Sequence, residues 1–83
     1  MEAYRIVTNA PDGEVTKSQL PMSIKRTIER KEDSLERTCR KMWTFTNREG
    51  NQYLFGSFCK NRDRLFVTIA YFNPSIQGWV SVQ

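Results

Sequence analysis

Apolar and polar residues alternate in the second half of the chain, where short runs of β-forming residues are separated by turn residues. Each of the three segments between the runs contains Asn together with Gly, Asp or Pro. Aromatic and β-branched runs bounded in this way are typical of strands joined by turns. The pattern therefore predicts a four-stranded antiparallel meander, with strands at Trp43 to Thr46, Gln52 to Cys59, Arg64 to Phe72 and Trp79 to Val82.

The same alternation predicts how the strands pair, because successive side chains of a strand point to opposite faces. The pairings that gather aliphatic residues on one face are Asn47 with Gln52, Cys59 with Arg64, and Phe72 with Trp79. One face then carries Trp43, Phe45, Leu54, Gly56, Phe58, Leu65, Val67, Ile69, Tyr71, Val80 and Val82. The opposite face carries Thr44, Thr46, Tyr53, Phe55, Ser57, Cys59, Phe66, Thr68, Ala70, Phe72, Trp79 and Ser81. In this register Gly56 lies opposite Trp43 and leaves room for its indole ring.

A stripe of apolar residues with helical spacing precedes the sheet. At about 100° per residue, five apolar side chains fall within an arc of roughly 60°: Ile24, Ile28, Leu35, Cys39 and Met42. The spacing predicts one helix that ends near Met42 and crosses one face of the sheet. Its start falls between Leu20 and Ile24, where Pro21 suits a first turn and Ser23 suits a cap.

The first twenty residues add less to the predicted fold. Tyr4 to Thr8 alternates weakly and is a candidate for a fifth, N-terminal strand, and Asn9 to Gly13 has the composition of a turn. Glu14 to Leu20 is either a loop or a short extended segment. A chain of 83 residues has room for one domain. We therefore predict a single α+β domain over residues 1–83, with element order β-α-β-β-β-β.

The composition is that of a water-soluble protein. Charged residues make up 27% of the chain, and no apolar run approaches the roughly 20 residues that cross a bilayer. The N-terminus does not resemble a secretory signal, so the two cysteines favour reduced thiols and a cytoplasmic location. A disulfide between Cys39 and Cys59 is the less favoured alternative, because the predicted registers put these residues on different faces. We expect no contact with a membrane.

The residues most often used in catalysis are few. The chain contains no His, and its acidic residues lack the spacing of a metal-binding loop. Cys39 belongs to the apolar stripe, and Cys59 lies beside Lys60 without an evident base to activate it. The four glycines are isolated and form no phosphate-binding loop. We expect no enzymatic activity, no metal and no cofactor.

Positive charge gathers on the predicted helix, in a chain whose net charge is +4. We call this predicted set the basic ridge: Arg26, Arg30, Arg37, Arg40 and Lys41. One interpretation is a surface that contacts phosphates or acidic side chains of a partner. The other is a solvated helix face, on which pairs such as Asp33 with Arg37 add little stability.

Aromatic side chains gather on the predicted sheet face that the helix does not cover. They are Tyr53, Phe55, Phe66, Phe72 and Trp79. Three interpretations stay open for this face. In the first, the N-terminal segment or sheet curvature encloses the rings. In the second, a partner protein docks there, or a second copy of the chain does so and forms a homodimer. In the third, single-stranded bases stack on the rings.

These features predict a small regulatory protein that binds a larger macromolecule. The expected partner is a protein or a nucleoprotein, which docks on the basic ridge, the aromatic face or both. The alternative is a direct nucleic-acid-binding protein, with phosphates on the basic helix and bases stacked on the sheet aromatics. The size and charge also suit an accessory protein of a mobile element.

Overall fold

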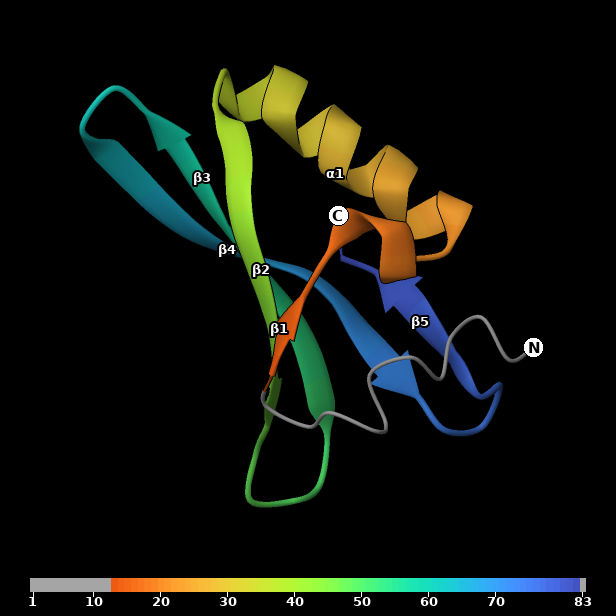
Figure 1. The fold of residues 1–83 in the computed structure, drawn as a ribbon. Coiled ribbons are helices and arrows are strands. Elements are labelled where there is room, and N and C mark those ends of the chain that lie inside the picture. The colour runs from red at the N-terminus through yellow and green to blue at the C-terminus, as the bar shows by residue number, and fades with distance from the viewer. Residues whose placement is uncertain (1–12, 83) are drawn as a thin grey trace.

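The computed structural model describes residues 13–82, which form a five-stranded antiparallel sheet with one helix lying across one face (Figure 1). The strands lie in the sheet in the same order as in the chain. Their bounds, with those of the helices, are β1 Glu14–Val15, a 3-10 turn Lys17–Gln19, α1 Met22–Leu35, β2 Thr38–Thr46, β3 Gln52–Lys60, β4 Asp63–Asn73 and β5 Gly78–Ser81. The predicted α+β fold and its β-α-β-β-β-β order are confirmed. The first strand is Glu14–Val15, whereas the candidate strand Tyr4 to Thr8 lies outside the described residues.

The hydrophobic core lies between α1 and the sheet. Ile24 and Ile28 of α1 are fully buried, and so are Phe58 and Ile69 of the sheet. These residues belong to one cluster of buried apolar side chains. At about 1.5–3 kcal/mol for each large apolar side chain removed from water, this layer dominates the stability of the fold.

The helix is shorter than predicted, because α1 ends at Leu35 and not near Met42. Glu36 adopts a left-handed conformation with φ of 54°, and the backbone N–H of Arg37 donates to the carbonyl of Glu32 at 3.1 Å. This arrangement closes the last turn as a Schellman motif does. The usual residue at the left-handed position is Gly or Asn, so the Glu here gave no stop signal in the sequence.

A β-bulge explains why the start of β2 has helical spacing. The register with β3 shifts by one residue between Cys39 and Lys41, with Arg40 as the extra residue. A bulge lets two residues an odd number of positions apart reach the same face. Cys39 and Met42 therefore both enter the core, although they lie three residues apart in a strand.

The loop between β2 and β3 is one residue longer than predicted. Thr46 pairs with Gln52, where the sequence pattern had paired Asn47 with Gln52. The side-chain Oδ1 of Asn47 accepts hydrogen bonds from the backbone N–H groups of Glu49 and Asn51, each at 2.9 Å. An Asn that bonds the backbone ahead of it belongs to the turn. The pairing of β2 consequently slips by one residue.

The slip moves two aromatic side chains to the other face of the sheet. Trp43 pairs with Phe55, and Phe45 pairs with Tyr53. Paired residues share a face, so Trp43 and Phe45 lie on the face turned away from α1. Their predicted place on the helix-facing side was wrong.

The role predicted for Gly56 is also wrong, because it pairs with Met42 and not with Trp43. A Cβ atom on Gly56 would come within 2.7 Å of Cδ1 of Ile69 and 2.9 Å of Cε1 of Phe58. The missing side chain therefore makes room for the core, and not for the indole ring.

A second bulge in β4 moves three predicted open-face residues to the core side of the sheet, namely Ala70, Phe72 and Trp79. The register with β3 shifts by one residue there, and the consecutive residues Ile69 and Ala70 are both fully buried. Alternation is inverted beyond this point. Phe72 packs edge-on against Trp79, with ring centroids 5.5 Å apart, and Trp79 is only 7% exposed. The predicted pairing of Phe72 with Trp79 is confirmed, but their predicted place on the open face is wrong.

Candidate functional site

The sheet face turned away from α1, here called the outer face, carries a connected group of aromatic rings. We call this group the aromatic platform: Trp43, Phe45, Tyr53, Phe55 and Phe66. The Trp43 ring lies 5.7 Å from that of Phe66 and 6.2 Å from that of Phe55. Phe55 in turn lies 6.2 Å from Phe45 and 6.3 Å from Tyr53. These distances are those of favourable aromatic pairs, so the rings support one another across three strands.

The platform is open to solvent at both of its ends. Phe66 is 59% exposed and Phe45 is 47% exposed. Tyr71 pairs with Tyr53, is also exposed, and extends the outer face toward the end of β4. Large rings that are this exposed on neighbouring strands mark a surface suited to an interaction.

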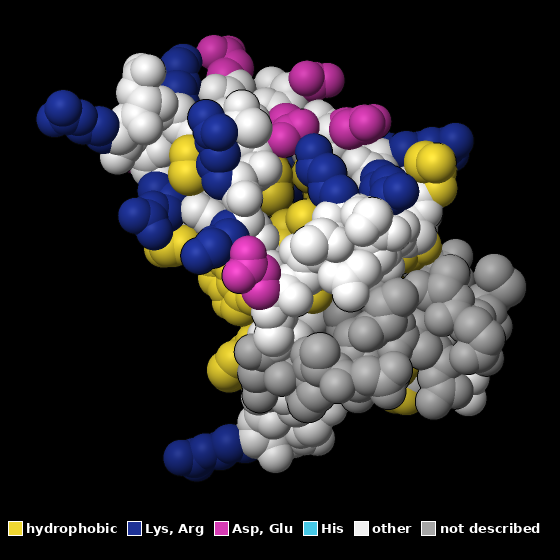
Figure 2. Space-filling model, in the orientation of Figure 1, with side chains coloured by type: hydrophobic (Ala, Val, Ile, Leu, Met, Phe, Trp, Pro, Cys, Tyr) yellow, Lys and Arg dark blue, Asp and Glu magenta, His cyan; other side chains and the backbone are white. Residues whose placement is uncertain are grey.

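A hollow of about 490 Å³ adjoins the platform at the β3–β4 hairpin. We call it the cationic hollow, and it is lined by Arg40, Lys41, Ser57, Cys59, Asn61, Arg62, Asp63 and Arg64. Figure 2 shows Lys and Arg side chains gathered over this end of the molecule, at the left of the view. The lining holds four cations and one carboxylate, and that carboxylate forms an ion pair with Arg37. The hollow is thus suited to an anionic group.

The platform and the hollow form one continuous surface. Ser57 of the hollow pairs with Lys41 on β2 and with Phe66 on β4. The guanidinium carbon of Arg64 lies 5.6 Å from the centre of the Phe66 ring. A ligand that covers the platform at Phe66 therefore meets positive charge immediately beside it.

The basic ridge predicted from the sequence is not a single helix face. Arg26 and Arg30 lie on α1, Arg37 lies in the connection after it, and Arg40 and Lys41 lie on β2. The ridge was wrong as a unit because the helix ends at Leu35.

The structure gathers a different set of cations. Arg40 and Lys41 line the hollow together with Arg62 and Arg64, which the ridge did not include. The available signal was the position of Arg62 and Arg64 on either side of Asp63, where a predicted hairpin closes. Arg40 and Lys41 lie on β2 and reach the same hollow across Ser57 and Cys59 of β3.

The predicted aromatic face is correct for three of its five residues. Tyr53, Phe55 and Phe66 lie on the outer face, whereas Trp79 lies in the core and Phe72 packs against it. Trp43 and Phe45 were missed because of the extra loop residue, and Tyr71 was missed because of the bulge in β4. An Asn-rich loop that begins with Asn47 was the one local signal for part of this change.

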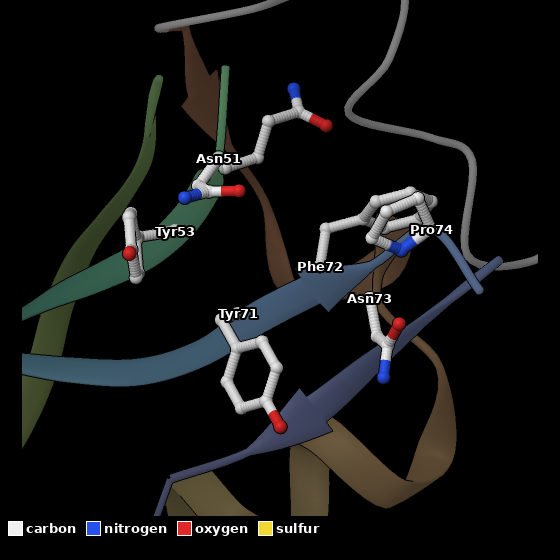
Figure 3. Close-up of a pocket in the computed structure, with 7 residues that line it drawn as sticks. Asn51, Tyr53, Tyr71, Phe72, Asn73 and Pro74 are labelled. Carbon is white, nitrogen blue, oxygen red and sulfur yellow. The ribbon is translucent and has the colours of Figure 1, made fainter. Parts of the chain in front are cut away.

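A second, shallow hollow lies where the platform meets the end of β4 (Figure 3). Its lining consists of Asn51, Gln52, Tyr53, Tyr71, Phe72, Asn73 and Pro74. Tyr53 and Tyr71 are cross-strand partners, while Phe72 points to the other side of the sheet (Figure 3). Among the described residues, the lining of this second hollow offers amide and phenol groups for hydrogen bonds and includes no charged side chain.

The two cysteines are free, as predicted, and they occupy different faces of the sheet, although Cys39 was predicted to lie on the helix. Cys39 is buried in the core, and this burial, aided by the Glu32 carboxylate, raises the pKa of its thiol to about 11. The thiol is therefore protonated and a poor nucleophile at neutral pH. Cys59 pairs with Arg64, which confirms that predicted register, and its sulfur lies 3.6 Å from the Ser57 hydroxyl.

Within residues 13–82, no three His, Cys, Asp or Glu side chains come together in a way that could hold a metal ion. In that same part of the chain, no helix is both long and apolar enough to cross a membrane. Comparison with protein-family models, curated proteins and solved structures found no match to this chain.

Proposed function

We propose that this protein is a non-enzymatic regulator that docks on a larger macromolecule through the outer face. The observation that carries the proposal is the aromatic platform, whose Phe45 and Phe66 ends are exposed on the side of the sheet opposite the core. Exposure of aromatic rings to water is unfavourable, and the free energy falls when a partner covers them. Aromatic residues with a neighbouring Arg are also the residue types that most often dominate binding energy at interfaces.

The chemistry of the described residues supports binding over catalysis. The buried Cys39 thiol is held protonated, and the sequence has no His to act as a base near neutral pH. The cationic hollow and the hollow at the end of β4 are both open surface features. A docking surface needs shape, apolar area and matching charge, and the outer face offers these.

The test compares two double variants as bait in extracts of the source cells. Phe45→Thr with Phe66→Thr removes the two exposed ends of the platform and keeps strand-forming residues. Met22→Thr with Ile76→Thr is the matched control, because these apolar side chains are 59% and 64% exposed and lie away from the platform. Thermal melts establish that each variant is folded.

We expect the wild type and the control to retain the same partner in stoichiometric amount, and the platform variant to lose it. Retention by the platform variant would contradict the proposal. A concentration-dependent dimer that only the platform variant abolishes would also contradict it, because the outer face would then be filled by a second copy of the chain.

A further inference from the structure

We propose that the macromolecule bound by the outer face is a single-stranded nucleic acid, with bases stacked on the aromatic platform and phosphates in the cationic hollow. This inference rests on the proposed function and names its partner. The observation behind it is that rings and cations occur side by side on one surface, joined at Arg64 and Phe66.

The charge of the hollow selects an anionic partner. Arg40, Lys41, Arg62 and Arg64 are all exposed, and the only carboxylate in the described lining, Asp63, is paired with Arg37. Exposed cations can each neutralise a phosphate and release its counterions. The hollow thus provides a set of phosphate contacts that needs no specific sequence.

The arrangement of the rings selects unpaired bases. Outer-face residues form three cross-strand rows, beginning with Lys41, Trp43 and Phe45 on β2. Neighbouring rows are two residues apart, or about 7 Å. Sheet platforms of this kind stack two or three bases, and only unpaired bases present a flat ring to them. A duplex would reach the hollow with its phosphates but would leave the platform uncovered.

The position of Glu14 indicates on which side of the aromatic platform the phosphate backbone of the bound strand runs. Glu14 of β1 pairs with Trp43, and its carboxylate disfavours a phosphate at that edge of the sheet. The phosphates are therefore expected at the Arg62 and Arg64 side, and the bases are expected to extend along the platform toward Phe45.

The test is a fluorescence anisotropy titration with labelled oligothymidylate, oligouridylate and a duplex of the same length, at several salt concentrations. We expect the wild type to bind both single strands more tightly than the duplex. The Phe45→Thr with Phe66→Thr variant should bind them at least about fivefold more weakly, because two stacking rings are lost.

Two triple variants with the same change in charge separate the hollow from the helix. Lys41→Gln, Arg62→Gln and Arg64→Gln together should weaken binding and lower the slope of log affinity against log salt by about 2. Lys25→Gln, Arg26→Gln and Arg30→Gln, all on α1, form the control and should leave that slope unchanged. If the hollow variant does not fold, Arg62→Gln in the exposed turn replaces it, with a slope change of about 0.7.

Several results would overturn the inference. They are an absence of binding at low ionic strength, equal affinity for the duplex, or an equal loss of salt dependence in the α1 control. If no oligonucleotide binds but nuclease-treated extract still yields a partner through the platform, this inference fails and the proposed function stands. If neither the oligonucleotide titration nor the extract experiment shows binding that depends on the platform, this inference and the proposed function both fail.

Discussion

The guanidinium of Arg64 lies over the ring of Phe66, 5.6 Å from its centre, and both side chains belong to the outer face of β4. At an exposed site such a pair contributes about 0.5–1 kcal/mol. The contact matters more for position than for stability, because it holds a cation at the border of the aromatic platform. It joins the platform and the cationic hollow into the surface on which the proposed function depends.

The two faces of the sheet should respond differently to the loss of an aromatic ring. Phe66→Thr should lower the free energy of unfolding by about 1 kcal/mol or less, because the ring is mostly exposed. Trp79→Ala should lower it by about 3–5 kcal/mol, because it leaves a cavity in the core. Urea unfolding of the two variants measures both changes. A larger loss for Phe66→Thr would contradict the bulge in β4 and the assignment of the faces.

The end of α1 predicts a stabilising substitution. Glu36 has a φ of 54°, which is strained for any residue with a Cβ atom, so Glu36→Gly should raise the free energy of unfolding by up to about 1 kcal/mol. Glu36→Ala is the control, since it keeps the strain and loses the same exposed ion pair with Lys60. Thermal melts compare the two. Equal melting temperatures for the two variants would show that Glu36 does not close the helix in this way.

The β2–β3 loop should depend on Asn47 and not on its neighbour of the same type. Asn47→Ala removes the acceptor of two backbone hydrogen bonds and should cost about 1–2 kcal/mol of stability. Asn51→Ala removes only a long side-chain contact to Glu49 and should lower the stability by no more than about 0.5 kcal/mol. Chemical denaturation distinguishes them, and equal losses would argue against the five-residue loop and the register of β2.

Stability should fall at alkaline pH because of Cys39. The thiol titrates near 9.0 in an unperturbed setting and near 11 in the folded protein. Between these values the unfolded chain has lost a proton that the folded chain keeps, so a rise in pH favours unfolding. Two pKa units correspond to a loss on the order of 2–3 kcal/mol.

The variant Cys39→Ala isolates this effect from the titration of Tyr and Lys side chains in the same range. The stability of this variant should decline less steeply than that of the wild type between about pH 9 and 11. Below pH 9 its free energy of unfolding should be lower than that of the wild type, because the buried sulfur is missing. Parallel curves for the two proteins in chemical denaturation would show that Cys39 is not buried as described.

Much of the fold was readable from sequence because turn residues and β-forming runs agreed in the second half of the chain. The pairing of Cys59 with Arg64 followed from a short hairpin, whose two-residue turn leaves little choice of register. The helix was also readable at Ile24 and Ile28, where apolar spacing and burial coincide.

The candidate site was readable only in part, because each face assignment depends on counting residues in twos. One extra residue at Arg40, one at Ile69 and one in the loop after Thr46 each reverse that count. Bulges are set by packing across the sheet, and no local residue preference announced these two. Tyr53 and Phe55 were placed correctly because β3 itself contains no extra residue. The first part of β2, up to Met42, was mistaken for helix.

The two indole groups offer the most direct measurement of the central claim. Trp43 lies on the platform, and Trp79 lies in the core with 7% of its surface exposed. In a ¹H–¹⁵N NMR titration with oligothymidylate, the Trp43 indole N–H resonance should shift or broaden progressively, because a stacked base alters its surroundings. The Trp79 indole resonance should stay in place and serves as the internal control. A titration in which Trp43 is unchanged while Trp79 or the α1 amides respond would contradict the outer face as the binding surface.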